Sequence, residues 1–350
     1  MSLRKLYSLL LAAAVVVAAA SCKDDDDDAS LPTLNGLKFE CPLFVTPGQH
    51  VEMTPKGVVH PEGKIVGYYW KVTPTMSKID TTRYENGLDT EGPEGKESDG
   101  TFEFTFSDTL GTYDVICYAF ASGYTGDSYI LEVAVVDGGL DRTITGTGIG
   151  KNDPKVTVDG IDYYYTTSNG LDWFRNNLAD VSSGAAYGNE IAASSVFGRY
   201  YTYEEAMTAC PDGWRLPTDA EWLMLCGEDP AKMQHKTVGG MASKLFANAS
   251  FNGEAMLEYW PQVGEITNSL NMAIIPSGFA NLGEKSGDGY PYAQFEGIID
   301  YAVVWTADKV EGEEDMAYYR YLVSDKPEFF IGKGETASFG ASVRCVRESK

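Results

Sequence analysis

Hydrophobic and polar residues alternate along residues 34–138, and this pattern predicts a sheet structure with one buried face. Strands are predicted at residues 37–41, 51–53, 68–72, 102–106, 111–119 and 129–136. A polar, Gly-rich stretch at 85–100 predicts a loop between them. We therefore expect an N-terminal all-β sandwich over 34–138, ending in a linker at Asp137, Gly138 and Gly139.

Residues 140–350 show a different pattern, with short strands and two clear helix starts. Thr202 and Glu205 stand three residues apart ahead of an apolar helical face, and Thr218 and Glu221 repeat the arrangement. In such a capping box, the Thr hydroxyl and the Glu carboxylate each accept a hydrogen bond from an otherwise unpaired backbone N–H. We interpret both glutamates as helix caps and not as catalytic carboxylates, and expect an α+β domain with two short helices.

The first 21 residues predict an export signal, because Arg4 and Lys5 precede an apolar core too short to span a bilayer. Cleavage after Ala18–Ala20 is one interpretation. The other is lipidation of Cys22, since the preceding residues resemble a bacterial lipobox. The acidic run at 24–28 resembles the export signal of Bacteroidota surface lipoproteins, although a plain solvated spacer over 22–33 would have the same composition.

The net charge and the number of cysteines limit the kinds of molecule that the chain can bind and the compartment in which it folds. The net charge of −24 disfavours binding to nucleic acid, because the chain repels phosphate backbones. There are six cysteines; with Cys22 lipidated, two disulfides and one buried thiol fit an oxidising compartment. We expect one disulfide between Cys41 and Cys117, which lie on predicted strands.

The N-terminal strands resemble an immunoglobulin-like or PKD-like sandwich. The resemblance rests on the segment YYWKV, which contains Trp70, and on GTYDV, which contains Tyr113. It implies that Trp70 is a core residue and that Tyr113 is a corner tyrosine.

The second domain resembles the Fibrobacter succinogenes major paralogous domain. The residues that carry this resemblance are GLDWFRNNLA at 170–179, the segment YTYEEAMTACPDGWRLPTDAEWLML, IIPSGFAN at 274–281, YAVVWTAD at 301–308 and the ending ASVRCVRES. The resemblance implies a C-type-lectin-like fold over 140–350, with a long-range disulfide between Cys210 and Cys345. Cys226 would then be the remaining buried thiol.

The sequence offers little sign of catalysis. GWRLPTDAEW also resembles the formylglycine-generating enzyme family, but the paired reactive cysteines of that family are missing, as no Cys occurs between Cys226 and Cys345. The three histidines stand at no metal-ligand spacing, and no hydrolase or nucleotide-binding motif occurs. We predict a non-enzymatic protein with no catalytic residues, no metal and no cofactor. A glycan hydrolase is a third-ranked alternative.

Several aromatic and acidic residues are candidates for a ligand site. Aromatic side chains on loops suit contacts with sugars or proteins, although packing of the loop is the more common reason for them. Carbohydrate-binding C-type lectins hold calcium with two residue triplets. The segment WTAD, from Trp305 to Asp308, lies near the position of the second triplet, but nothing in the chain resembles the first, which argues against calcium-dependent sugar binding. The candidate ligand-binding residues are Tyr259, Trp260, Tyr290, Tyr292, Trp305 and Asp308.

Together these patterns predict a lipoprotein attached to the outer membrane and facing the exterior. Its expected role is recognition or adhesion, with a glycan or a host or matrix protein as ligand. A structural subunit of a cell-surface assembly is the alternative.

Overall fold

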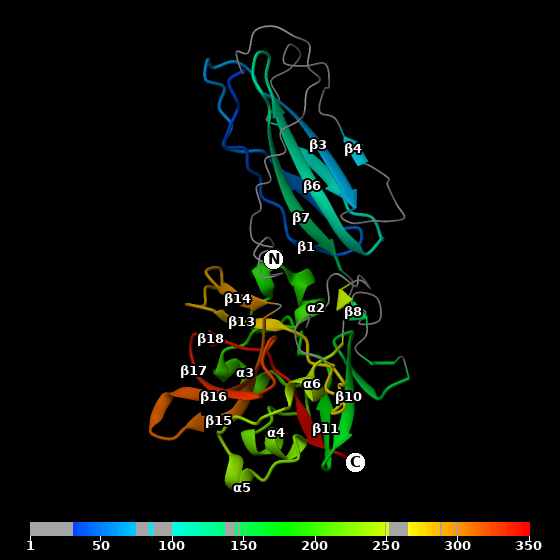
Figure 1. Cartoon of the computed structure of the whole chain (residues 1–350), viewed down its shortest axis with the longest axis vertical. Coiled ribbons are helices and arrows are strands. Elements are labelled where there is room, and N and C mark those ends of the chain that lie inside the picture. Colours follow the sequence, from blue (N-terminus) through cyan, green and yellow to red (C-terminus); the bar gives the residue numbers. More distant parts are fainter. Residues whose placement is uncertain are drawn as a thin grey trace. The chain divides into compact units, whose positions relative to one another are not determined.

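The computed structural model describes residues 31–74, 84–86, 100–136, 144–145, 148–150, 152–248, 250–251, 265–287, 289–298 and 300–350 (Figure 1). The expected export signal, Cys22, the acidic run and the candidates Tyr259 and Trp260 lie outside these residues. The chain divides into two compact units between Val135 and Val136.

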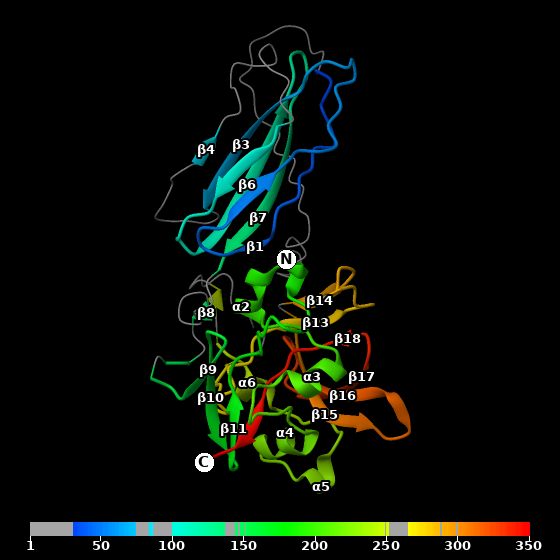
Figure 2. The same ribbon diagram turned by 180° about the vertical axis from the view of Figure 1, so that it is seen from behind.

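The first unit is all β. Its strands are β1 (Phe44–Val45), β2 (His50–Met53), β3 (Gly67–Pro74), β4 (Tyr84–Asn86), β5 (Phe102–Thr105), β6 (Gly111–Phe120) and β7 (Asp127–Val135). One sheet has the order β1-β7-β6-β3-β4, and β2 pairs with β5 in a second. The long strands β3, β6 and β7 run side by side in both views (Figures 1 and 2).

The two sheets share one hydrophobic core centred on Trp70. The rings of Phe39 and Phe102 pack against the Trp70 ring at centroid distances of 4.8 and 5.4 Å. The indole N–H of Trp70 donates to the carbonyl oxygen of Gly100 at 2.8 Å. The apolar ring is thus removed from water, and its polar N–H keeps a hydrogen-bond partner.

Tyr113 forms the local bond expected of a corner tyrosine. Its ring is buried, and its hydroxyl donates to the carbonyl oxygen of Thr109, four residues upstream, at 2.9 Å. This bond fixes the turn that leads into β6.

The predicted disulfide between Cys41 and Cys117 is wrong, because Cys117 is a free thiol. Cys117 is fully buried in β6, where its cross-strand neighbours are Trp70 and Tyr129. Cys41 precedes β1 and is not paired with Cys117 across a strand ladder. Burial raises the pKa of the Cys117 thiol to about 12, so the residue behaves as a small core hydrophobe.

The second unit mixes strands with short helices. Its strands are β8 (Ile144–Thr145), β9 (Lys155–Val158), β10 (Ile161–Ser168), β11 (Leu171–Phe174), β12 (Ser250–Phe251), β13 (Ser277–Asn281), β14 (Gln294–Ile298), β15 (Tyr301–Val310), β16 (Glu313–Val323), β17 (Phe330–Glu335), β18 (Phe339–Gly340) and β19 (Val346–Glu348). Its helical segments are η1 (Tyr187–Asn189), η2 (Ile191–Ala193), α2 (Ser194–Phe197), α3 (Tyr203–Ala209), α4 (Asp219–Leu225), α5 (Pro230–Met233) and α6 (Ala242–Leu245).

Two larger sheets form the frame of this unit. One has the order β19-β11-β10-β9, and the other has the order β14-β13-β15-β16-β17, with β18 paired to β13. A buried core of mostly aromatic and aliphatic side chains draws residues from both sheets, including Phe174 and Trp305. Within the residues described, no helix is long and apolar enough to span a bilayer.

The two predicted helices are α3 and α4, and both begin with the predicted capping boxes. Thr202 and Glu205 cap α3, while Thr218 and Glu221 cap α4, each with both reciprocal bonds present. The structure adds three α-helices of four residues each, α2, α5 and α6. Helices this short carry no strong sequence periodicity, so their absence from the sequence-based prediction has a simple cause.

Candidate functional site

A disulfide between Cys210 and Cys345 connects the end of α3 to the residue just before β19. Cys345 is fully buried, and 135 residues separate the two cysteines. The pairing implied by the resemblance is therefore present. Cys226 is a free thiol, and burial raises its pKa to about 12.

The segment that contains Cys345 directs its side chains inward. Arg344 is buried and donates through Nε to the side-chain oxygen of Asn177 at 2.9 Å and through Nη1 to the carbonyl oxygen of Arg175 at 2.8 Å. The amide nitrogen of Asn177 in turn donates to the hydroxyls of Ser277 and Ser342, both at 3.2 Å. Burial lowers the pKa of Arg344 to about 9, with a further contribution from the nearby Arg175.

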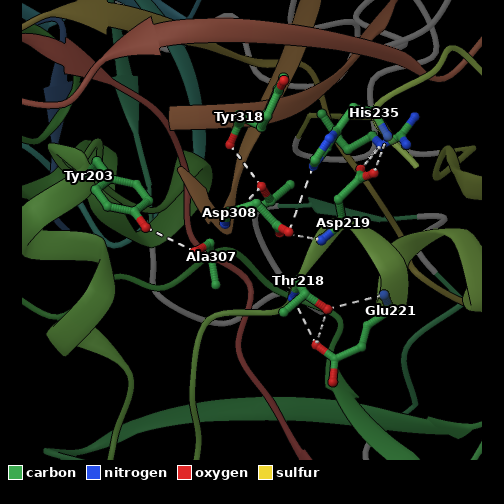
Figure 3. Close-up of polar contacts among 10 residues, drawn as sticks. Tyr203, Thr218, Asp219, Glu221, His235, Ala307, Asp308 and Tyr318 are labelled. Atoms are coloured by element: carbon green, nitrogen blue, oxygen red, sulfur yellow. Dashed lines mark hydrogen bonds and ion pairs between the residues drawn. The ribbon is translucent and has the colours of Figure 1, made fainter. Parts of the chain in front are cut away.

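A second polar cluster lies at the start of α4 (Figure 3). Asp219 and Arg320 are both fully buried and form an ion pair, with Nε of Arg320 donating to Oδ1 of Asp219 at 2.6 Å. The other carboxylate oxygen of Asp219 accepts the backbone N–H of His235 at 2.7 Å. Asp308 accepts the backbone N–H of Asp219 at 2.7 Å, so its carboxylate stabilises the first turn of α4.

His235 and Asp308 bring an imidazole close to a carboxylate, which invites a catalytic interpretation. Nε2 of His235 lies 3.7 Å from Oδ1 of Asp308, beyond hydrogen-bond distance. The His235 ring is stacked on Tyr318 with centroids 3.9 Å apart. These contacts join β15, β16 and the segment after α5 to the start of α4, and the arrangement is that of a structural cluster.

Two of the predicted ligand-binding aromatic residues are buried. Trp305 is fully buried, and its indole N–H donates to the carbonyl oxygen of Tyr201 at 2.8 Å. Tyr290 is 5% exposed, and its ring lies under the ammonium group of Lys285. Both rings pack against the loops and sheets around them, so neither is exposed for a ligand to stack on. For Tyr290 this agrees with the alternative that it packs its loop.

The other predicted ligand-binding residues have different positions. Tyr292 is 78% exposed, so its ring is accessible to a ligand. Asp308 is largely buried and engaged at α4, as described above, so its carboxylate has a structural role. The structure does not bring Tyr292 and Asp308 into one site.

A hollow of about 450 Å³ lies between the loop before α2 and the loop before β14. Its lining residues are Gly184, Ala185, Ala186, Asn189, Ile191, Arg199, Ser286, Gly289, Tyr290 and Pro291. Both views draw α2 near β13 and β14 (Figures 1 and 2). A volume of this size falls within the range of small-ligand sites.

Arg199 is the charged residue that lines the hollow, and no sequence motif marked it as a candidate. It is 8% exposed, and it donates to the carbonyl oxygens of Ser183 and Gly184, both at 2.8 Å. Burial lowers the pKa of Arg199 below the ordinary value, although electrostatic attraction from Tyr201, Asp180 and Glu205 opposes this effect. The sequence signal was a single arginine in the apolar stretch SSVFGRYY, which predicts a buried cation.

Carboxylates, imidazoles and thiols are the groups that would hold a metal ion. Among the residues that the structure describes, no group of three or more His, Cys, Asp or Glu side chains is arranged to hold one. The oxygen-rich segment 311–315 lies at the β15–β16 turn, and Glu313 there pairs with Lys333 at 2.6 Å.

The motif residues define the class of domain to which the second unit belongs. The family model of the Fibrobacter succinogenes major domain matches residues 164–347, which is just over half of the chain. The chain belongs to this family. No curated protein matches the sequence of the chain.

Proposed function

We propose that this protein is a surface lipoprotein of the Bacteroidota type that recognises a glycan or a host or matrix protein and does not act as an enzyme. In this proposal Cys22 carries the lipid, the first unit is an immunoglobulin-like or PKD-like sandwich, and the second is a C-type-lectin-like domain that faces the exterior at the outer membrane. The hollow that contains Arg199 is the observation that carries the binding role.

Two features support recognition over catalysis. The family motifs supply structural bonds: Cys210 and Cys345 form the disulfide, and Asn177 and Arg344 form the buried polar cluster. The accessible groups lie on loops held by this frame, which is how scaffold proteins commonly present binding residues. Tyr292 directly follows Pro291 of the hollow and is mostly exposed.

The binding role is tested with a glycan array probed with the purified protein and with its Tyr292→Ala variant. We expect a defined set of glycans to bind, and the variant to bind them about fivefold more weakly, because stacking of a ring on a ligand contributes on the order of 1 kcal/mol. Val59→Ala is the matched control, since Val59 is 80% exposed in the first unit.

If neither the array nor a mucin pull-down yields a ligand, the glycan-binding role is lost. A discrete multi-subunit complex after detergent extraction would then favour the alternative role, a structural subunit of a surface assembly.

The membrane attachment is tested with Cys22→Ala. Loss of the thiol removes the acylation site, so the protein should move from the membrane fraction to the soluble fraction. Cell fractionation and metabolic labelling with a fatty-acid analogue measure this. A variant that stays membrane-bound and labelled would show that another residue provides the anchor.

A further inference from the structure

The hollow contains a buried positive charge that forms no ion pair with a carboxylate of the described residues. Arg199 makes no ion pair within 4.0 Å in the part of the chain that the structure describes. Its bonds go to the carbonyl oxygens of Ser183 and Gly184 and, at 3.4 Å, to the hydroxyl of Ser194. These are neutral acceptors, so the guanidinium retains an unpaired charge.

Other buried arginines of this unit differ from Arg199. Arg175 pairs with Asp153 at 2.7 Å, and Arg320 pairs with Asp219 at 2.6 Å. Arg344 has neutral partners, but it is 1% exposed and lines no described hollow. Arg199 combines an unpaired charge with a place in the wall of a hollow, which is the arrangement expected of an anion-binding residue.

The free donors of Arg199 suit a carboxylate. A guanidinium has five N–H groups. Nε uses its one N–H on Ser183, Nη1 uses one of two on Ser194, and Nη2 uses one of two on Gly184. One N–H remains on each terminal nitrogen. Such a pair can bind the two oxygens of one carboxylate in parallel.

The remaining walls suit a sugar ring. Ile191 is 71% exposed, and Pro291 is also exposed, so both offer apolar surface at the rim. Asn189 and Ser286 are exposed lining residues with side chains that hydrogen-bond to hydroxyls. A pyranose presents this combination of apolar C–H groups and hydroxyl groups.

We infer that the hollow binds the carboxylate of an acidic sugar residue, a uronic or sialic acid, through Arg199. This inference rests on the proposed glycan-binding function and specifies the class of glycan. The net charge of the chain, −24, opposes an acidic ligand at long range. Selectivity therefore depends on short-range contacts inside the hollow, where salt screens charges less than it does in open solvent.

Calorimetric titration of the purified protein with matched methyl glycosides tests the inference. Methyl glucuronide and methyl glucoside differ in a carboxylate, and N-acetylneuraminic acid methyl glycoside represents the sialic acids. We expect at least one acidic probe to bind about tenfold or more tightly than the neutral glucoside, as a charge-assisted bidentate contact would give.

Two variants locate the binding. Ile191→Glu puts a negative charge at the exposed rim and should weaken binding of the acidic probe about tenfold. Met207→Glu is the matched control, because Met207 is an exposed apolar residue of α3 outside the lining, and binding should be unchanged. Arg199→Gln should abolish the preference for the acidic probe. If Arg199→Gln does not fold, the effect of Ile191→Glu on binding of the acidic probe still tests whether the hollow is the binding site.

The outcomes separate this inference from the proposed function. Equal binding of acidic and neutral probes, or acidic binding that Ile191→Glu leaves unchanged, overturns the inference while glycan recognition stands. No binding of any acidic probe also overturns it. In that case hits on the glycan array would preserve the proposed function, and an empty array would remove both.

Discussion

Buried arginines hold together loops that have few partners in a sheet. Arg175 donates to the carbonyl oxygens of Asn271 and Gly148, and Arg320 donates to that of Lys236. Carbonyl groups in irregular backbone need such donors when they are removed from water. At the residue scale, the second unit therefore depends on a few side chains with many bonds each.

Removing one charge of a buried pair tests this dependence. Asp219→Asn should destabilise the second unit by about 3–5 kcal/mol, because the fully buried Arg320 would lose its counter-ion. Chemical unfolding measures the change. Asp229→Asn is the control, since its pair with Lys232 is exposed and contributes on the order of 1 kcal/mol or less. Equal effects of the two variants would contradict this account.

At the scale of elements, the start of α4 combines a helix cap with a surface contact. The Glu221 carboxylate accepts a hydrogen bond from the backbone N–H of Thr218 at 2.7 Å. It also accepts one from each terminal nitrogen of Arg215, at 2.5 and 2.9 Å. Burial raises the pKa of Glu221, but the bonds from Arg215 and Thr218 outweigh it, so the pKa lies below the ordinary value. The carboxylate is therefore a stabilising group only while it is ionised.

This arrangement predicts a loss of stability in acid. A group with a lowered pKa in the folded state contributes its full stability above the unfolded-state value of 4.5 and loses it as the pH falls through the folded-state value. Denaturant midpoints at neutral pH and at about pH 3 should differ less in Glu221→Gln than in the parent chain. Glu228→Gln, just after α4, is the control and should keep the parent's pH dependence.

The predictable elements are those with a local signal. The capping boxes at Thr202 and Thr218 and the core position of Trp70 follow from a few neighbouring residues. The hollow does not, because Arg199 and Pro291 stand far apart in the sequence and are joined by tertiary packing. For Tyr290 the sequence left both ligand contact and loop packing open, since its loop packs on residues that sequence proximity cannot identify.

At the scale of the whole molecule, two units with separate cores differ in how they are stabilised. The first unit has a core around Trp70 and no disulfide among its described residues. The second has short helices, many loops and the disulfide between Cys210 and Cys345. A loop-rich fold gains most from such a link, because the link restricts the unfolded chain.

Replacing Cys210 should therefore affect one unit alone. Cys210→Ser should destabilise the second unit by roughly 4–5 kcal/mol on the entropic estimate for a loop of this length. The first unit should keep its unfolding midpoint. Cys226→Ser is the control, since this thiol forms no disulfide. Denaturation followed by hydrogen exchange resolves the two units, and a uniform shift of both would contradict their independence.

The same disulfide also bears on how the second unit would respond to mechanical force. A pull applied to Val136 and Lys350 acts through the bond and cannot straighten the chain between Cys210 and Cys345. The separation of 135 residues corresponds to about 450–490 Å of extended chain that the bond keeps out of the load path. Under tension an unfolded second unit would behave as a shortened tether, and reduction of one covalent bond would lengthen it almost threefold, roughly in proportion to the chain released.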